Sequence, residues 1–344
     1  MGPVAPLIAI AQALTVKVAT HNYASLHGVV KPDFLFIGTA TGPEKDFLSQ
    51  YPDIKFKSIP AGKIRRYFSL LNLFAPFFVI AGFIKAFFIL LFFKPNAIVS
   101  AGGFVAVPVI FAGKLLGAKI FIHQLDLEPT LSNILVKKLA NTITVTFAKS
   151  LEDFKDSNSI LVGSLIREEA KQITSSKSNR KIVLFLGGGT GAKILNELAI
   201  KTAPLLPEVE FWQITGKNKK IESQNMPANF HSFEFLNKGY YEKLAQADLV
   251  ISRGGLSTLM ELSDLIKPTV IVPIPTSQQE QNASYFADRK AAVYLEQTEL
   301  TPDTLAGKIK SLLNNPQELE ELAKNIEKIM DHEGEQKVAD IILK

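Results

Sequence analysis

The chain alternates short apolar runs, each closed by turn residues, with longer segments of helical periodicity. The runs are DFLFIGT, NAIVSAGG, KIFIHQ and TITVTF in the first half, then KIVLFLGGG, VEFWQITG, FHSFEFL, ADLVISRGG and PTVIVPIP in the second. This alternation is typical of parallel sheets with crossover helices. It restarts after Ser157, and 344 residues exceed what one core usually serves. The sequence therefore predicts an α/β protein of two doubly wound, Rossmann-like domains.

These domains are expected at residues 1–158 and 159–326, with a helical tail at 327–344. An amphipathic helix is predicted from Asn315, and a short one after Gly334. At the other end, Pro3 and Pro6 suit the first turn of a helix. Because a doubly wound domain normally begins with a strand, the first strand of the N-terminal domain is missing from the pattern.

Composition excludes several classes of function. The absence of cysteine rules out disulfides, thiolate catalysis and cysteine metal sites. The net charge of +5 is a mild excess that favours phosphates or an anionic membrane without indicating nucleic acid. Neither a Walker motif nor an acidic strand end at the dinucleotide offset is present, which disfavours kinases and dehydrogenases.

Three predicted strand ends carry glycines directly before a helical segment. They are Gly102 with Gly103, residues 187–191, and Gly254 with Gly255. A helix N-terminus leaves N–H groups unpaired and carries partial positive charge, so it stabilises an anion where side chains leave room. Taken alone, the glycines of each turn could equally serve only to let the backbone turn from strand to helix. Together they favour a diphosphate site.

Polar residues near these turns suit a sugar nucleotide. Glu261 lies in the second turn of a helix that starts near Leu256, where its carboxylate can accept two hydroxyl hydrogen bonds from a ribose. Alternatively, Glu261 lies near the helix N-terminus only because the helix dipole favours a negative charge there. The amides of Gln278 and Gln279 suit sugar hydroxyls, or else belong to a solvated loop. Arg167 follows the interdomain joint and either reaches a diphosphate or lies on the surface.

The motifs SAGGFVAVPVIFAGKLLGAKIFIHQLD, LSNILVKKLA, LGGGTGAKILN, ADLVISRGGLSTLMEL and QQEQNA resemble those of the MurG family of inverting glycosyltransferases. The similarity runs through essentially the whole chain. It implies a GT-B fold of two facing domains, with the donor bound mainly by the C-terminal domain and residues 327–344 crossing back to the first. It also implies transfer of N-acetylglucosamine from UDP-GlcNAc to undecaprenyl-pyrophosphoryl-MurNAc-peptide (lipid I), forming lipid II.

The same resemblance assigns individual residues. Glu261 is expected to bind the ribose, and Phe235 with Leu236 the uracil. The predicted donor set is Arg167, Gly188, Gly189, Thr190, Gly191, Phe235, Leu236, Gly255, Leu256, Ser257, Thr258, Leu259, Met260, Glu261, Gln278 and Gln279. Gly102, Gly103, Asn133, His123 and Asp126 are expected to line the acceptor side.

The reaction needs a base, for which Asp126 is the first candidate and His123 the second. No metal or cofactor is expected, since no convincing DxD pattern is present. The chain departs from the family pattern at two motifs. Met1-Gly2-Pro3 stands in place of a turn ending in Gly-Gly-His, and His123-Gln124-Leu125-Asp126 in place of His-Glu-x-Asn.

Residues 68–93 hold nine of the 24 phenylalanines, more than one helix needs to cover a sheet. Pro76 and Gly82 favour two short helices lying in a membrane interface. A spanning helix would separate strands of one sheet across the bilayer, and a core or oligomer contact is the remaining alternative. The sequence thus predicts peripheral docking to an anionic membrane, and the family resemblance implies its cytoplasmic face. The residues expected to dock are Phe87, Phe88, Phe92, Phe93, Arg65 and Arg66.

Two other functions remain open from the sequence. One is a related UDP-sugar transferase or epimerase that acts on a different acceptor. The other is a non-catalytic, N-terminally truncated UDP-sugar binder.

Overall fold

Parallel strands form the centre of each half of the chain, and helices connect them. The computed structural model describes residues 3–20, 31–42, 44–62, 71–173, 179–187, 193–216, 226–234, 236 and 239–344. For residues 71–76 only the backbone is described. The chain divides into an N-terminal unit, residues 2–167 with 332–344, and a C-terminal unit of residues 168–331. The predicted α/β class is confirmed.

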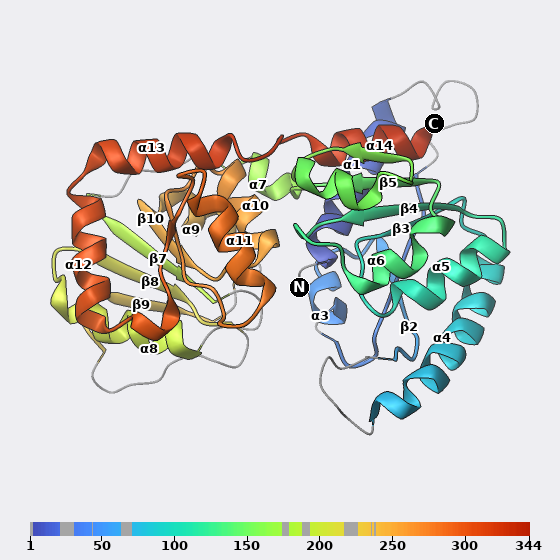
Figure 1. The fold of residues 1–344 in the computed structure, drawn as a ribbon, viewed down its shortest axis with the longest axis horizontal. Coiled ribbons are helices and arrows are strands. Elements are labelled where there is room, and N and C mark those ends of the chain that lie inside the picture. Colours follow the sequence, from blue (N-terminus) through green and yellow to red (C-terminus); the bar gives the residue numbers. More distant parts are fainter. Residues whose placement is uncertain are drawn as a thin grey trace. The chain divides into compact units, whose positions relative to one another are not determined.

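Four parallel strands form the main sheet of the N-terminal unit, in the order β3-β4-β5-β6 (Figure 1). They span Ala97–Ser100, Lys119–Gln124, Thr142–Val145 and Ser159–Leu161. Among the described strands, β1 (Phe34–Gly38) and β2 (Ile54–Ser58) pair only with each other. The sequence places the domain boundary before Ser159, whereas β6 begins there and pairs with β5. Residues 159–167 therefore stay with the N-terminal unit.

Helices surround these strands in the N-terminal unit. They are α1 (Val4–Thr20), α3 (Glu44–Leu48), α4 (Leu71–Phe93), α5 (Ala106–Leu115), α6 (Leu131–Val136) and α14 (Gly334–Leu343), with the 3₁₀ helices η1 (Lys137–Leu139) and η2 (Ala148–Phe154). The predicted first helix is confirmed as α1. Its apolar face packs against α14, with Ile10 and Ala13 of α1 and Val338 and Ala339 of α14 in one buried cluster. The first and last helices of the chain thus share one core.

Residues 71–93 form one continuous helix, so the prediction of two short helices is wrong. Pro76 lies within the second turn, where it removes one backbone hydrogen bond without ending the helix. Gly82 allows a close approach, because a Cβ there would lie 2.3 Å from the carbonyl oxygen of Pro60. None of the helices in the described ranges combines the length and apolarity that crossing a membrane requires.

The C-terminal unit contains a six-stranded parallel sheet in the order β12-β11-β10-β7-β8-β9. The strands, from β7 to β12, span Ile182–Leu186, Glu210–Ile214, Phe230–Phe233, Leu249–Ser252, Thr269–Ile271 and Val293–Tyr294. β7 and β10 are buried along their whole length, as expected for central strands covered on both faces. The strand order reverses between them, because β8 and β9 extend the sheet on one side and β11 and β12 on the other. In doubly wound sheets, ligands bind beyond the carboxyl ends of the strands at such a reversal.

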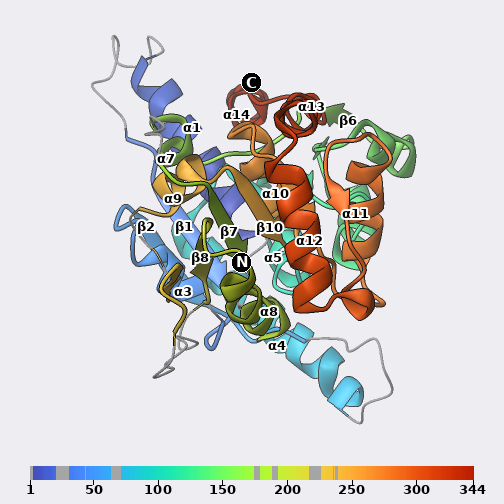
Figure 2. The same cartoon turned by 90° about the vertical axis from the view of Figure 1, so that its left-hand side faces the viewer.

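Helices cover both faces of this sheet (Figure 2). They are α7 (Glu168–Lys171), α8 (Lys193–Thr202), α9 (Tyr240–Gln246), α10 (Leu256–Asp264), α11 (Gln278–Ala287), α12 (Pro302–Leu313) and α13 (Pro316–Glu327), with η3 (Ala203–Leu205) and η4 (Gln297–Glu299). Leu195 of α8 and Leu305 of α12 join Phe185 and Phe211 of the sheet in one buried cluster. The amphipathic helix predicted from Asn315 is confirmed as α13, with Asn315 as its N-cap.

Candidate active site

The strand reversal places helix α10 and its preceding turn at the carboxyl end of β10. Gly255 is the N-cap of α10 and has no atom within 4 Å of where a Cβ would stand. Space is thus open beside the first N–H groups of the helix, as an anion requires. Gly254 differs, because a Cβ there would lie 2.6 Å from the carbonyl oxygen of Gln279. The turn after β10 and helix α11 therefore approach each other at backbone contact.

Helix α11 is fixed against that turn by side-chain hydrogen bonds. The Asn282 amide donates to the carbonyl oxygen of Gly254 at 2.8 Å. Ser277 caps α11 by accepting from the Gln279 N–H, and the Gln279 Oε1 accepts from the Ile274 N–H at 3.1 Å. The predicted amides Gln278 and Gln279, both half-buried, are thus brought beside the glycine turn of α10.

Glu261 lies in the second turn of α10 and is 8% exposed. Its carboxylate accepts one hydrogen bond on each oxygen. The Tyr240 hydroxyl donates to Oε2 and the Tyr241 hydroxyl to Oε1, each at 2.9 Å. The residue predicted to hold a hydroxyl pair therefore already binds two hydroxyls. Sequence reasoning missed both tyrosines, although their adjacency at the start of a helix was visible.

The other predicted donor residues divide by exposure. Ser257 and Thr258 are half-buried on the open side of α10, whereas Leu256, Leu259 and Met260 are buried in the core. These three apolar residues can offer a ligand only their backbone. Leu236 is half-buried. Gly188, Gly189, Thr190, Gly191 and Phe235 lie outside the described residues.

Arg253, just before the glycines, has a structural role. Its guanidinium donates from Nη1 to the carbonyl oxygens of Val272 at 2.9 Å and Pro273 at 3.0 Å. Arg253 is 8% exposed, and burial lowers its pKa. The arginine ties the ends of β10 and β11 together.

Arg167 is the last residue of the N-terminal unit. Its Nη1 donates to the Tyr51 hydroxyl at 3.2 Å, and its guanidinium carbon lies 5.1 Å from the centre of the Phe47 ring. The preceding backbone is also held, since the Ile166 N–H donates to the buried Glu335 carboxylate at 3.2 Å. Arg167 is thereby oriented on the surface of α3.

Among the residues predicted for the acceptor side, Gly102 and Gly103 follow β3 with positive φ angles of 91° and 94°. The Gly103 N–H donates to the Ser132 hydroxyl at 3.0 Å. A Cβ on Gly102 would lie 3.4 Å from the Asn133 Oδ1. Three of the predicted residues, Gly102, Gly103 and Asn133, are thus brought together by the start of α6.

His123, the second candidate base, lies inside the sheet. The side chain is fully buried, with Nδ1 3.1 Å from the Thr144 hydroxyl and Nε2 3.1 Å from the Thr146 hydroxyl. Burial lowers its pKa to about 3. Both ring nitrogens therefore contact threonine hydroxyls inside the sheet, which disfavours His123 as the base.

Asp126 is the other candidate base. It follows β4 and is half-buried, and burial raises its pKa. Its loop is held by Gln124, whose amide donates to the carbonyl oxygens of Asp126 and Glu128, both at 2.8 Å. A carboxylate with a raised pKa is a stronger proton acceptor than a solvated one.

Helices α4, α5 and α6, together with Phe104 just before α5, carry exposed apolar side chains, called here the α4–α6 surface. It consists of Phe77, Phe78, Ile80, Ile84, Phe88, Leu91, Phe92, Phe104, Phe111, Leu115, Leu131, Ile134 and Leu135. Of the four phenylalanines predicted to dock, Phe88 is 53% and Phe92 81% exposed. Phe87 and Phe93 are less exposed, since both are half-buried, and Phe87 packs against the core. Arg65 and Arg66 lie outside the described residues.

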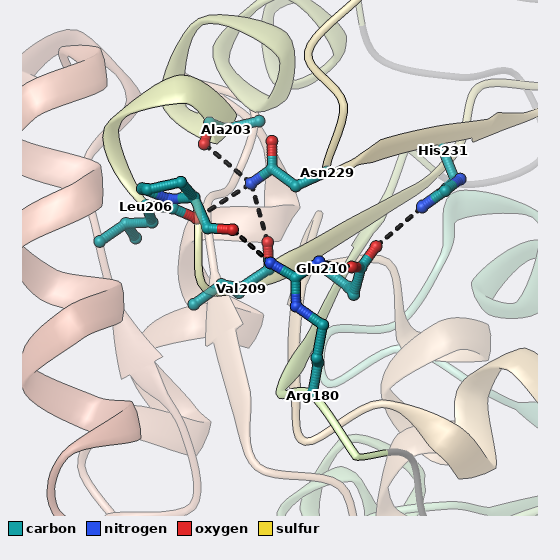
Figure 3. Close-up of polar contacts among 8 residues, drawn as sticks. Arg180, Ala203, Leu206, Val209, Glu210, Asn229 and His231 are labelled. Atoms are coloured by element: carbon teal, nitrogen blue, oxygen red, sulfur yellow. Dashed lines mark hydrogen bonds and ion pairs between the residues drawn. The ribbon is translucent and has the colours of Figure 1, made fainter.

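A second polar cluster lies at the opposite, amino-terminal edge of the C-terminal sheet. One oxygen of the Glu210 carboxylate accepts a hydrogen bond from the Arg180 guanidinium. The other oxygen lies 2.7 Å from His231 Nε2 (Figure 3). The Asn229 amide nitrogen lies 2.8–2.9 Å from three carbonyl oxygens, those of Ala203, Leu206 and Val209. These contacts stabilise the loops at this edge. Across the described ranges, no group of three or more acidic or histidine side chains is arranged to hold a metal.

Comparison with known proteins agrees with this architecture. Residues 1–145 match the N-terminal domain and residues 182–341 the C-terminal domain of glycosyltransferase family 28. The chain is 33% identical over 293 residues, 81% of this chain and 82% of the relative, to a UDP-N-acetylglucosamine–N-acetylmuramyl-(pentapeptide) pyrophosphoryl-undecaprenol N-acetylglucosamine transferase of Clostridium perfringens. The transferase of the same name from Borreliella burgdorferi is 32% identical over 328 residues, 91% of this chain and 88% of the relative.

Solved structures share the fold. Acinetobacter baumannii MurG superposes with a TM-score of 0.72 at 24% identity, covering 99% of this chain and 96% of that one. A Neisseria meningitidis UDP-GlcNAc 2-epimerase gives 0.66 at 15% identity, covering 97% of this chain and 96% of that one.

The two parallel α/β units resemble the GT-B fold, and the family matches with the curated relatives show that the chain is a glycosyltransferase. The chain belongs to glycosyltransferase family 28 and is MurG-like.

Proposed function

We propose that this protein transfers N-acetylglucosamine from UDP-GlcNAc to undecaprenyl-pyrophosphoryl-MurNAc-peptide with inversion, forming lipid II. The observation that carries the proposal is the identity of about a third, over most of the chain, to transferases named for this reaction. Glu261 supports it independently, because a buried carboxylate in the second turn of α10 suits a ribose.

In this proposal the C-terminal unit binds the donor. Glu261 accepts from the ribose hydroxyls, and the turn at Gly255–Thr258 faces the diphosphate. Gln278 and Gln279 bind the sugar hydroxyls. Residues 188–191, Phe235, Leu236 and Arg167 complete the contacts that the family resemblance assigns.

The chemistry requires in-line attack by the acceptor hydroxyl on the anomeric carbon. Asp126 takes the proton, and its raised pKa supports that role. The negative charge that develops on the departing UDP is stabilised by the N-terminus of α10. In this mechanism, backbone N–H groups rather than side chains stabilise the charge on the leaving group.

We assign the α4–α6 surface to membrane docking, which would bring the protein to a lipid-linked acceptor at the cytoplasmic face. So many exposed aromatic and aliphatic side chains on helices that pack against one another, α4 on α5 and α5 on α6, are unusual for a free surface. Lys85 and Lys94 on and next to α4 are exposed and attract anionic headgroups.

The test is a transfer assay with purified protein, UDP-GlcNAc and lipid I in detergent micelles, with lipid II detected by chromatography. Lipid II formation is expected. Binding of UDP-GlcNAc without transfer to lipid I, or its conversion to an epimer, would replace this proposal with one of the two alternatives.

A further inference from the structure

We infer that a pocket on one face of β8 and β9 binds a small carboxylate that carries an apolar group. Lys243 supplies the cation of this site, and Trp212 with Phe233 supplies its apolar floor. None of the three residues belongs to the predicted donor set or to the residues predicted for the acceptor side. The inference therefore goes beyond the proposed function and does not depend on it.

The pocket lies on the face of the C-terminal sheet that is opposite its main core. Alternate residues of a strand point to the same face. Phe211 of β8 and Phe230 of β9 belong to the buried cluster formed with α8 and α12. Trp212 and Phe233 point the other way and are only half-buried. On this face α9 packs against β7, and beside it lies a pocket of about 440 Å³ that both aromatic residues line.

Lys243 of α9 brings a positive charge into this pocket. Its ammonium lies 3.8 Å from the centroid of the Trp212 ring and 4.6 Å from that of Phe233. Burial lowers the pKa of Lys243, and within the described ranges no carboxylate forms an ion pair with it. Aromatic faces attract a cation, but they replace only part of the hydration of its three N–H donors. An anion that reaches the ammonium is therefore stabilised.

Glu210 also lines the pocket, but its carboxylate is engaged elsewhere (Figure 3). One oxygen accepts a hydrogen bond from the Arg180 guanidinium, and the other lies 2.7 Å from His231 Nε2. The ion pair with Arg180 offsets the negative charge of Glu210. A ligand that enters the pocket can thus approach Lys243 without breaking an existing ion pair.

The geometry favours a carboxylate attached to an apolar group over a free phosphate. Phosphate is bound best by several convergent donors, such as an arginine fork or a helix N-terminus. This pocket instead offers one ammonium above two aromatic rings. The rings bury apolar surface of a ligand, while the ammonium donates a charge-assisted hydrogen bond to its carboxylate. An N-acylated apolar amino acid is the simplest molecule with this chemistry, and the volume of the pocket is in the range of small-molecule sites.

Trp212 is the only tryptophan of the chain, so tryptophan fluorescence reports on this pocket. The experiment titrates the full chain with N-acetylphenylalanine, with its uncharged amide and with inorganic phosphate. Lys243→Met keeps the apolar stem and removes the charge, whereas Lys243→Arg keeps the charge. Lys201→Met is the matched control, because Lys201 is exposed on α8, which packs on the opposite face of the sheet. Circular dichroism verifies that each variant is folded.

Wild type is expected to show a saturable change in emission with N-acetylphenylalanine. The acid should bind at least about tenfold more tightly than the amide, the effect of one hydrogen bond between charged groups. Lys243→Met is expected to lose this preference, while Lys243→Arg and Lys201→Met keep it. The inference is overturned if wild type does not respond or binds acid and amide equally, or if folded Lys243→Met retains the preference. Phosphate binding as tight as that of the acid would overturn the ligand class.

A second titration separates the pocket from the donor site. N-acetylphenylalanine is expected to bind with the same affinity in the presence of saturating UDP. Loss of its binding there would assign the pocket to the donor site and overturn the inference. Failure of the proposed function looks different, because UDP then does not bind in calorimetry, while the response of Trp212 to the acid is retained.

Discussion

The Asn133 amide donates a hydrogen bond to the Gln124 Oε1 at 2.7 Å. Gln124 in turn donates to the carbonyl oxygens of Asp126 and Glu128. One buried glutamine thus connects the end of β4, the loop that carries the candidate base and the start of α6. The connection needs a side chain that both donates and accepts.

Gln124→Glu is therefore expected to lower the free energy of unfolding of the N-terminal unit by about 2–4 kcal/mol at pH 7, because a carboxylate cannot donate to the two carbonyl oxygens and is itself buried. Urea denaturation followed by circular dichroism measures this. Gln317→Glu on the exposed side of α13 is the control and is expected to be near neutral. Equal stability of the two variants would contradict the role given to Gln124.

His123 makes stability depend on pH. Its pKa is about 3 in the fold, against an ordinary value of 6.5. Between these values the unfolded chain binds the extra proton, so the stabilisation is complete above pH 6.5 and is lost as the pH falls toward 3. The slope is about 1.4 kcal/mol per pH unit. Urea denaturation of His123→Gln should give a shallower slope between pH 6 and 4.5 than wild type, and an unchanged slope would contradict this role of His123.

The two glycines before α10 are expected to respond differently to alanine. Gly254→Ala places a methyl group 2.6 Å from the Gln279 carbonyl oxygen and must displace α11. We expect a loss of about 1–3 kcal/mol in stability, from overpacking, together with weaker UDP-GlcNAc binding. Gly255→Ala meets nothing within 4 Å and should leave the melting temperature unchanged. Thermal unfolding and titration calorimetry of the two variants test this difference. Equal melting temperatures would contradict the close contact between Gly254 and α11.

Asp126→Asn is expected to lower kcat by about 10²–10⁴-fold, the usual contribution of a general base, with little effect on the donor KM. In wild type, kcat should decline as the pH falls through the raised pKa of Asp126, because only the carboxylate accepts a proton. Glu128→Gln, two residues along the same loop, is the matched control. A near wild-type rate for Asp126→Asn would remove it as the base.

Phe88→Ser with Phe92→Ser should reduce co-sedimentation with vesicles that contain phosphatidylglycerol, since these side chains are the most exposed of the four predicted to dock. Ile194→Ser with Leu205→Ser removes two exposed apolar side chains from the C-terminal unit and is the control. Undiminished binding by the phenylalanine variant would show that the α4–α6 surface does not face the lipid.

The fold class followed from the sequence because hydrophobic periodicity is a local property. Runs such as IVLFL are fully buried in the sheet, and the strand-ending glycines precede α5 and α10. The single helix at 71–93 did not follow. Whether Gly82 breaks a helix or admits a neighbour depends on Pro60, which is distant in sequence.

The candidate site was predictable where motif and helix position coincide, as at Glu261. The site was not predictable where a side chain's role depends on hydrogen bonds to residues distant in the sequence. His123 has the right residue type for a base, but Thr144 and Thr146 of the neighbouring strand and loop occupy its nitrogens. Gln124 gave no signal, and the adjacency of the two tyrosines did not reveal their contact with Glu261, because hydrogen bonds between separate elements leave no periodic trace in a sequence.

The packing of α1 against α14 has a consequence for synthesis on the ribosome. Residues 334–343 supply part of the N-terminal unit's core, and they are translated after the whole C-terminal unit. The N-terminal unit therefore cannot complete its core until those residues have emerged. Domains that fold early during translation are normally contiguous stretches of chain. Here the second unit has the opportunity to fold first, and the arrival of α14 is the step that allows the first to complete its core.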